Sequence, residues 1–533
     1  MKADRRTAIG LGAGAMAVAG GGAALAFRSA PIPPGLVEGA DAARGHRLRQ
    51  GGFPAPSRTE RTGIVIVGGG IAGLSAGWTL AEAGFTDFRL LEIEDATGGN
   101  ARSGANAVSA YPLGAHYLPV PNREAVALRR MLARLGIITG EADGLPVYDP
   151  AQLCADLQER LLWRGRWQEG LVPTTGLRPK DRADLTRFEQ LMAEARTAIG
   201  RDGRPAFATP IAYSSHDPDW LALDQQTFAE WLDARGLTSP VLRAHVRYAM
   251  RDDYGTEPDA TSAWAGVHYW AGRRGHAAAR VADNVLTWPG GNGHLAQAMA
   301  ARFRDRIITG QIVHRVAREG GSAIVDRFDT ANATTTRIHA DAAILATPLF
   351  ISARLCGELG DMSACTYAPW LVANVTVAHA PRGPGVPLAW DNVSSTSDSL
   401  GYVVATHQSR ALPGQTVLTW YLPLSDMTPA VGRRLLIERP ADEWKRMVRD
   451  DLLAMHPDLE ISEIALSRWG HAMIRPTPGH IWTRAPAITA TPPLFLAHSD
   501  LSGLSLFEEA HWQGTRAAEL AMTLIGHGYE ALA

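Results

Sequence analysis

The stretch VGGGIAGLSAGWTLAEAG, residues 67–84, decides the fold of this chain. It follows the β-branched run 63–67, which is typical of a buried parallel strand, and its apolar residues then recur at helical spacing. The glycines of the turn between strand and helix stand in the pattern G-x-G-x-x-G, which lets backbone approach a pyrophosphate at a helix N-terminus. The sequence therefore predicts a dinucleotide cradle. Its residues are Gly68, Gly70, Ile71, Ala72 and Gly73.

A second short strand is predicted over 88–92, and its last residue is Glu92. In dinucleotide-binding folds an acidic residue about 20 positions beyond the glycine turn accepts a hydrogen bond from a ribose hydroxyl. A carboxylate at this place disfavours a ligand with a 2′-phosphate. The cradle is thus expected to hold NAD or FAD rather than NADP.

The composition excludes several other classes of protein. With 533 residues, of which 46% are hydrophobic, the chain is long enough for two or more domains. A formal net charge of -2 gives no basic field for nucleic acid, so no nucleic-acid partner is expected. The three cysteines, Cys154, Cys356 and Cys365, show no metal-binding spacing, and no metal site is predicted.

The N-terminus has the features of an export signal. Arg5 and Arg6 precede an uncharged segment rich in Gly and Ala that ends in the cleavage-like triplet 24–26. This pattern resembles a twin-arginine signal over residues 1–26, which predicts the twin-arginine export machinery as a partner and a periplasmic or secreted location. So much glycine makes a poor permanent membrane span, so cleavage or loose tethering is favoured over an uncleaved membrane anchor. Residues 27–61, rich in Pro and Gly, are predicted to be a linker.

Beyond Glu92, the segment DATGGNARSG, 95–104, resembles the flavin-containing amine oxidases and their relatives, the protoporphyrinogen oxidases and phytoene desaturases. The resemblance implies that Gly98 and Gly99 lie close to FAD phosphates. The family usually has Arg directly after this pair, whereas this chain has Asn100. Arg102, two places later, is expected to face the phosphates instead.

Further motifs follow the same family along the chain. The segment YPLGAHY, 111–117, resembles the stretch that passes the flavin ring, which implies that Gly114 and Ala115 lie against the ring. His116 and Tyr117 would then border the substrate cavity as catalytic candidates. The segment 288–295 is similar to a Gly-Gly motif of the family, and 341–348 to a strand that ends in A-T-P. Between them, Val313 is expected to contact the adenine through its backbone.

The C-terminal segments 495–500 and 508–518 resemble the closing FAD motif, a strand followed by a helix that enters beneath the flavin. The resemblance implies that Asp500 faces the ribityl chain or the phosphates, that Glu509 and Ala510 contact FAD, and that the helix dipole favours negative charge on the reduced flavin. An NAD enzyme has no use for this tail, so FAD is favoured. The closing motif has no cysteine to which flavin can attach, which predicts non-covalent FAD.

The resemblance implies an α/β fold with a Rossmann-like FAD-binding domain of the GR2 type and an inserted, mixed α+β substrate domain. The FAD-binding domain is expected to comprise 62–120, 280–348 and 480–533. The substrate domain is expected to comprise 121–279 and 349–479, with helical stretches such as 228–249. The ligand cavity should lie between the two domains.

One departure from the family concerns catalysis. Amine oxidases often have a lysine on the strand after the A-T-P element, but here that strand, 370–377, contains none, and the only lysines are Lys2, Lys180 and Lys445. Asn374 is the candidate on this strand for orienting a water. A carboxylate in the cavity would recognise a cationic amine, and aromatic rings would accept a neutral one. Further cavity candidates are Asp252, Asp253, Tyr254, His268, Tyr269, Trp270, Trp390, Asp391 and Asn392.

These observations favour an exported FAD-dependent oxidoreductase of the amine oxidase type. Its substrate is expected to be a small amine, whose C–N bond is dehydrogenated by hydride transfer to flavin, with reoxidation by oxygen or another acceptor. The missing lysine favours an alternative, a C–C desaturase or a protoporphyrinogen-oxidase-like enzyme. A third possibility is a flavin-binding protein without turnover.

Overall fold

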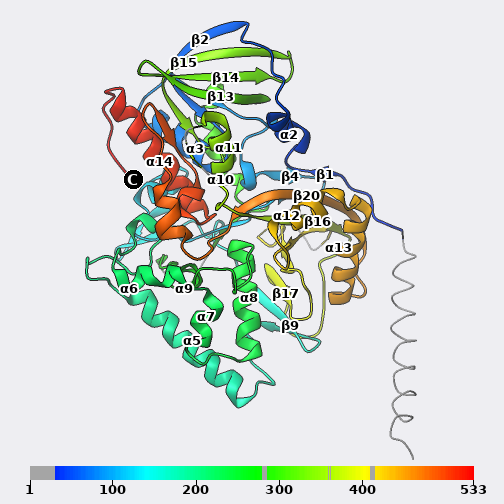
Figure 1. Cartoon of the computed structure of the whole chain (residues 1–533). Helices are drawn as coiled ribbons and strands as arrows, with labels where there is room; N and C mark the ends of the chain where they lie inside the picture. Colours follow the sequence, from blue (N-terminus) through cyan, green and yellow to red (C-terminus); the bar gives the residue numbers. More distant parts are fainter. Residues whose placement is uncertain (1–30, 279–284, 358, 361, 409–413, 533) are drawn as a thin grey trace, which may run out of the picture.

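The fold is that of a computed structural model, which describes residues 31–278, 285–357, 359–360, 362–408 and 414–532 (Figure 1). The predicted export signal, 1–26, lies outside these residues. In the part of the chain that is described, no helix is both long enough and apolar enough to cross a bilayer. The expected α/β class is confirmed, because strands and helices from distant parts of the sequence combine in two large mixed sheets and a helical layer.

The first sheet carries the glycine turn, and in the described residues it has seven strands in the order β12-β3-β2-β15-β14-β13, with β21 paired to β15. Strands β2, β3, β15 and β21 run parallel, so their carboxyl ends meet at one edge. The strands are β2 (Arg58–Val67), β3 (Phe88–Leu91), β12 (Ile307–Ile308), β13 (Gln311–Glu319), β14 (Ser322–Asp329), β15 (Thr334–Leu345) and β21 (Leu494–Leu496).

Helices cover this sheet on both faces. Two of them, α3 and α14, pack against each other so closely that a Cβ at Gly514 on α14 would overlap the carbonyl oxygen of Ala72 on α3. This contact fixes the N-terminus of α14 relative to the glycine turn. The helices around the sheet are α3 (Ile71–Glu82), α4 (Val126–Arg134), α10 (Gly293–Ala301), α11 (Leu349–Cys356) and α14 (Phe507–Leu524).

The second sheet lies in the middle of the molecule in Figure 1 and has the order β1-β20-β16-β19-β18-β17-β9-β10. Its central strand β16 is buried along its whole length, and helices α12 (Pro429–Glu438) and α13 (Ala441–Met455) accompany it. The strands are β1 (Val37–Glu38), β9 (Glu159–Trp163), β10 (Arg166–Glu169), β16 (Tyr367–Val377), β17 (Asp391–Ser394), β18 (Tyr402–Val404), β19 (Thr416–Pro423) and β20 (Ile461–Ile474).

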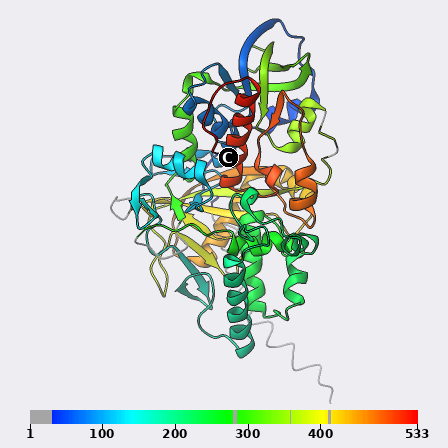
Figure 2. The same ribbon diagram turned by 90° about the vertical axis from the view of Figure 1, so that its left-hand side faces the viewer.

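A helical layer closes the end of the molecule opposite the first sheet, as both views show (Figures 1 and 2). The predicted helical stretch 228–249 is two helices, because Gly236 adopts φ +66° and Pro240 begins a new helix. The helices of this layer are α5 (Pro179–Thr197), α6 (Pro218–Leu221), α7 (Phe228–Asp233), α8 (Pro240–Tyr254) and α9 (Ala263–Ala271).

Short two-stranded ribbons connect these layers. The ribbon β11-β6 joins residues far apart in the sequence and brings the segment around Tyr117 between the two large sheets. The strands are β4 (Ser103–Ala105), β5 (Ala110–Pro112), β6 (Tyr117–Pro119), β7 (Ile138–Ala142), β8 (Leu145–Tyr148) and β11 (Val285–Thr287).

The segment predicted to be a linker, 27–61, is packed against the fold in its described part. Strand β1 pairs with β20, helix α2 (Ala42–Gln50) has Asp41 as its N-cap, and Leu48 is buried in a hydrophobic core. The last four residues of the segment belong to β2. This expectation is therefore corrected. A two-residue strand and a short polar helix show too little hydrophobic periodicity for the sequence to predict them. They are stabilised by the surfaces of the protein that they contact.

Candidate functional site

The glycines of the turn between β2 and α3 are needed for two different reasons. A Cβ at Gly68, where φ is +104°, would lie 2.7 Å from the carbonyl oxygen of Ala346, and one at Gly73 would overlap the carbonyl oxygen of Gly68. These two glycines are required by the packing of the protein itself. The nearest neighbour of a Cβ at Gly70 would be the Cα of Gly99, at 4.0 Å. The backbone of Gly70 therefore borders open space that a ligand can enter.

The predicted ribose acceptor and the second glycine pair converge on this turn. Glu92 is buried, and its carboxylate accepts hydrogen bonds from the N–H of Gly69, at 2.6 Å, and from a second backbone N–H. Burial raises the pKa of Glu92. The N–H of Gly98 donates to the carbonyl of Gly69 at 2.7 Å, which brings Gly99 over Gly70.

The N-terminus of α3 completes the cradle. Its N-cap, Gly70, has no side chain, and no side-chain hydrogen bond caps the helix. The N–H groups of the first turn, on Ile71, Ala72 and Gly73, have no acceptor within the helix and favour an anion. The uncapped helix, the open space at Gly70 and the buried Glu92 fit the diphosphate and ribose of a dinucleotide.

Arg102 does not take the role predicted for it. Its Nη2 donates to the carboxylate of Asp95 at 2.8 Å, and its Nη1 lies 3.9 Å from that of Glu94. These two carboxylates neutralise the charge that was expected to face phosphates. The expectation is corrected because the acidic residues that follow β3 lie within reach of the guanidinium, a proximity that the sequence motif does not reveal.

Val313 lies near the end of β3, where an adenine contact was predicted. It stands at a bulge in β13 that interrupts the ladder with β14. The N–H of Gln311, at the start of β13, donates to the backbone carbonyl of Glu92 at 2.8 Å. The backbone of Val313 is thus held on the side of the sheet where the cradle begins.

Asp500 is buried, and one of its two carboxylate oxygens is bonded to the protein. Its Oδ2 accepts hydrogen bonds from the N–H of Leu349 at 3.0 Å and from the hydroxyl of Tyr367 at 2.6 Å, and Nδ1 of His498 lies 3.0 Å from its Oδ1. The carboxylate joins β21 to α11 and β16. Oδ1 has no hydrogen-bond donor among the described residues, so the expectation that Asp500 faces the ribityl chain or the phosphates stays a prediction.

The closing motif presents a different glutamate from the one predicted. Glu509 turns away from the cavity, and its Oε1 accepts a hydrogen bond from the N–H of Ile211 at 2.7 Å. Its neighbour Glu508 lines the cavity, whereas Ala510 does not. Glu508 is thus the glutamate of this motif that lines the cavity, and contact of Glu509 and Ala510 with FAD stays a prediction. The phase of a helix decides which of two adjacent side chains faces a cavity, and the sequence motif alone does not give that phase.

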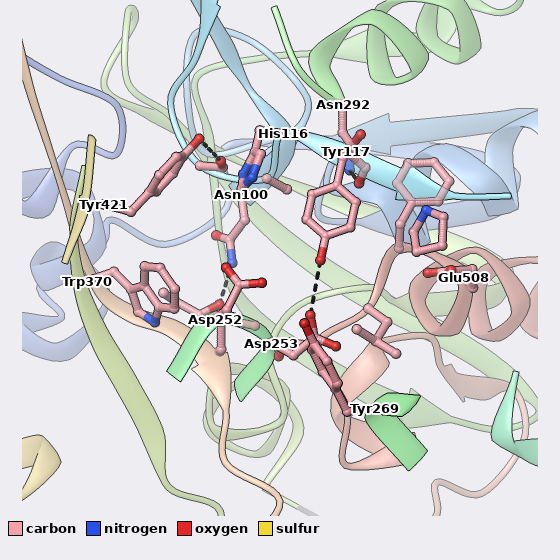
Figure 3. Close-up of a pocket in the computed structure, with 18 of the residues that line it drawn as sticks. Asn100, His116, Tyr117, Asp252, Asp253, Tyr269, Asn292, Trp370, Tyr421 and Glu508 are labelled. Atoms are coloured by element: carbon pink, nitrogen blue, oxygen red, sulfur yellow. Dashed lines mark hydrogen bonds between the residues drawn. The ribbon is translucent and has the colours of Figure 1, made fainter. Parts of the chain in front are cut away.

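A cavity of about 160 Å³ opens between the first sheet's helices, the second sheet and the helical layer, and Figure 3 shows residues that line it. The predicted stretch Gly114–Ala115 forms part of its wall. A Cβ at Gly114 would overlap the carbonyl oxygen of Asn100, and the N–H of Ala115 donates to that oxygen at 2.9 Å. The hydroxyl of Tyr421 donates to the carbonyl of Gly114 at 3.2 Å, so the stretch is held firmly.

His116 and Tyr117 both line the cavity, as predicted. The ring of His116 stacks on Tyr421, with centroids 4.6 Å apart and planes at 28°, and its edge contacts Tyr117. Burial lowers the pKa of His116 to about 4, so the imidazole is neutral at neutral pH. Trp370 adds a further ring to this wall (Figure 3). The aromatic wall, defined as His116, Tyr117, Trp370 and Tyr421, gives the cavity an apolar side.

Charged groups stand on the side of the cavity formed by α8 and α9. The guanidinium of Arg273 binds both carboxylate oxygens of Asp253, at 2.6 and 2.7 Å, and donates to the hydroxyl of Tyr117 at 3.0 Å. That pair is neutral overall. Asp252 forms no salt bridge with an arginine or lysine in the described part of the chain, and burial together with the Asp253 carboxylate raises the pKa of Asp252 to about 7.

Asn374 does not reach the cavity. Its Nδ2 donates to the carbonyl of Pro112 at 3.0 Å, and its Oδ1 accepts from the hydroxyl of Thr419 at 2.8 Å. Both polar atoms are satisfied inside the sheet, so its predicted role in orienting a water is corrected. Lys180 and Lys445 are also distant from the cavity lining, in α5 and α13.

The other cavity candidates divide into two groups. Four of them line the cavity, namely Asp252, Asp253, His268 and Tyr269. Five stand behind this lining, namely Tyr254, Trp270, Trp390, Asp391 and Asn392. Glu508 and Arg273 also line the cavity but were not predicted as site residues. Arg273 follows a helix end rich in aromatic residues, a pattern by which the sequence could have indicated it.

Comparisons with known proteins agree with this geometry. The family model described as flavin-containing amine oxidoreductase matches residues 71–522. The protein AofH of Mycobacterium tuberculosis, whose name describes it as a flavin-containing monoamine oxidase, is 27% identical over 274 residues. That similarity covers 49% of this chain and 53% of AofH, so the chain spans about half the length of this relative.

Solved structures share the fold over nearly the whole chain. Cyclohexylamine oxidase from Brevibacterium oxydans superposes with a TM-score of 0.61 at 16% identity, covering 87% of this chain and 99% of the other. A protein of Exiguobacterium named as a protoporphyrinogen oxidase superposes with a TM-score of 0.58 at 18% identity, covering 88% and 100%. At such low identity these similarities establish the fold alone.

Proposed function

The chain belongs to the family of flavin-containing amine oxidoreductases, and from this premise we propose that it is an exported FAD-dependent enzyme that dehydrogenates the C–N bond of a small amine. The observation that carries the proposal is the cavity: an aromatic wall faces Asp252, a carboxylate without a cationic partner in the described residues. An ammonium group fits between a carboxylate and aromatic rings.

The dinucleotide that we propose for this cradle is FAD, because the family is flavin-containing. The first turn of α3, with Gly70 and Gly99, would hold the diphosphate, and Glu92 would accept a ribose hydroxyl. The cavity beyond the cradle would receive the flavin ring. No cysteine contributes to the described cavity lining, which supports non-covalent attachment.

When bound, the flavin supplies an acceptor for hydride from the carbon next to the amine nitrogen. The chain's own residues prepare the amine. Asp252 attracts the ammonium form, and its carboxylate can hold the proton that the nitrogen must lose before hydride leaves. His116 and Tyr421 form an apolar face that orients the C–H bond and excludes water.

A second candidate function is a C–C desaturase or a protoporphyrinogen-oxidase-like enzyme. The observation that favours it is β16, which carries no lysine along its buried length. Because this lysine is missing, the proposed electron acceptor is either oxygen or another molecule. A desaturase substrate has no ammonium group, so it would not depend on the charge of Asp252.

We also propose that the twin-arginine pathway exports the protein to the periplasm or beyond. Arg5 and Arg6, followed by an uncharged segment, support this assignment. The pathway carries folded proteins, so FAD can bind before export.

The direct test is to purify the protein, denature it and record the released chromophore, then to offer the native protein a panel of amines. We expect a soluble yellow chromophore with the mass of FAD, and bleaching of bound flavin by an amine under anaerobic conditions. Peroxide formation in air identifies oxygen as the acceptor. A flavoprotein bleached by no amine contradicts the amine assignment, and a protein that neither carries nor takes up flavin overturns the whole proposal.

A further inference from the structure

Glu508 is a buried carboxylate at the wall of the cavity for which the proposed amine chemistry has no use. It lies in the first turn of α14, is 6% exposed and lines the cavity, where Figure 3 shows it across from Asp252. Within the described residues, no side chain donates a hydrogen bond to its carboxylate, and its own backbone N–H is the one hydrogen-bonding group that lowers its pKa. A buried carboxylate so poorly partnered is costly unless another group or a proton compensates its charge.

The position of α14 places Glu508 near the flavin ring. Gly514 contacts Ala72 in the first turn of α3, where the diphosphate would bind. Glu508 precedes Gly514 by six residues, so it stands roughly 9 Å further along the helix axis, at 1.5 Å per residue. The five-carbon ribityl chain of FAD would span this distance, and the flavin ring would then lie at the cavity end of α14.

The groups around Glu508 do not neutralise it. Arg273 attracts the carboxylate, but this guanidinium is already bound to both oxygens of Asp253, whose charge repels Glu508. The other titratable side chains that line the cavity are His116, Tyr117, Asp252, His268, Tyr269 and Tyr421. On α14 itself, Glu509 lies beside it and is bound to the N–H of Ile211.

We propose that Glu508 is the proton acceptor coupled to flavin reduction: it gains a proton from solvent when the ring beside it gains electrons. This inference rests on the proposed function only in that FAD occupies the cavity. Two-electron reduction with one proton leaves an added negative charge on the ring. A second proton taken up by the carboxylate restores the charge balance, because COO⁻ becomes COOH while the two electrons come from the reductant.

The sign of the pH dependence follows from the environment. Burial raises the pKa of Glu508 to about 7, and an added negative charge nearby raises it further in the reduced protein. Below about pH 7 the carboxyl is protonated in both redox states, and no extra proton is taken up. Above that pH it is ionised in the oxidised protein only, so reduction draws in one more proton.

The test is the midpoint potential of the bound flavin between pH 6 and 9, measured anaerobically with redox dyes on the FAD-loaded protein. For a two-electron couple, each proton taken up contributes about 30 mV per pH unit. We expect the slope of the wild type to correspond to one proton below pH 7 and to two protons above it. Glu508→Gln should keep the one-proton slope throughout and have a higher potential than the wild type at pH 8.5.

Two further variants sharpen the result. Glu508→Asp retains a carboxyl group and should retain the two-proton slope, which also provides a second reading if Glu508→Gln folds poorly. Glu509→Gln removes the adjacent carboxylate, which turns away from the cavity, and should leave the slope unchanged. Identical profiles for the wild type and Glu508→Gln, or an equal loss of the second proton in Glu509→Gln, would overturn the assignment. Because the reductant is chemical, the measurement succeeds even if no amine is turned over.

Discussion

At the scale of single residues, the glycine turn shows that one motif serves both the fold and the ligand. Gly68 and Gly73 are required because a side chain there would collide with backbone, whereas Gly70 faces open space. The sequence pattern does not distinguish these three glycines. Their separate roles become visible only when the neighbours of each Cα are known.

This difference predicts opposite outcomes for two substitutions. Gly70→Val should fold with a melting temperature close to that of the unliganded wild type but bind FAD at least about tenfold more weakly, because the side chain occupies the diphosphate's place. Gly73→Ala should unfold at lower temperature even without FAD, because its Cβ overlaps the Gly68 carbonyl. Thermal unfolding of apoprotein and titration with FAD measure the two effects, and a Gly70→Val protein that binds FAD normally contradicts the cradle.

Asp252 provides a second prediction at this scale. Its carboxyl, with a pKa raised to about 7, becomes charged as the pH rises from 6 to 8, so kcat/KM for a cationic amine should increase over that range. Asp252→Asn should remove this increase and lower kcat/KM at pH 8 by about 10- to 100-fold, the equivalent of ~1.5–3 kcal/mol for a charged hydrogen bond.

The matched control for Asp252 is an uncharged amine analogue or an alcohol of the same shape. Its binding to the wild type should not follow the same pH profile, because it gains nothing from the ionised carboxylate. A pH profile that Asp252→Asn leaves in place would assign the titration to another cavity group.

At the scale of elements, β16 shows how a residue suited to catalysis can have a purely structural role. Asn374 joins three segments of chain, because it bonds to Pro112 at the end of β5 and to Thr419 on β19. Its strand is buried on both faces, so an amide there must satisfy its hydrogen bonds within the protein.

We therefore predict that Asn374→Ala lowers stability rather than chemistry. Loss of the amide leaves the Pro112 carbonyl and the Thr419 hydroxyl without their partner, at a cost of about 1–3 kcal/mol in the free energy of unfolding. Denaturant unfolding should show this loss, while kcat for an amine substrate changes less than about threefold, a difference under 1 kcal/mol. A large fall in kcat with unchanged stability would restore the catalytic interpretation.

In helix α14, the rotation of the helix decides which side chain can contact a ligand. Its two adjacent glutamates are equivalent in the sequence, yet one faces the cavity and the other bonds to the backbone of Ile211. Contact with α3 at Gly514 sets the rotation of the helix, and that rotation decides which carboxylate can influence a ligand.

At the scale of the whole molecule, segments from the two ends and the middle of the chain build one site. The parallel strands β2, β15 and β21 lie side by side although some 430 residues separate the first from the last. A protein assembled in this way must fold completely before it can hold a dinucleotide. Export in the folded state is consistent with that requirement.

The proposed export predicts a clear effect of changing the signal. Replacing Arg5 and Arg6 together by lysine preserves charge but removes the twin-arginine motif, so we expect flavin-loaded protein to accumulate in the cytoplasm. Cell fractionation followed by flavin fluorescence measures the distribution. The matched control is the single change Arg44→Lys, which lies in α2 beyond the predicted signal and should leave export unchanged. Equal export of the double variant and the wild type would contradict this route.

The sequence by itself determined the glycine turn between β2 and α3, the resemblance to the flavin amine oxidoreductases, the α/β class and the positions of His116 and Tyr117 on the cavity wall. These features depend on local chemistry, since a tight turn needs glycine and a buried strand needs β-branched residues. Tertiary structure alone decided that Arg102 pairs with Asp95, that Asp500 is held by Tyr367 and that Glu508 rather than Glu509 faces the cavity. Charges and hydrogen bonds act through space, and no spacing along the chain reveals which partner a side chain will meet.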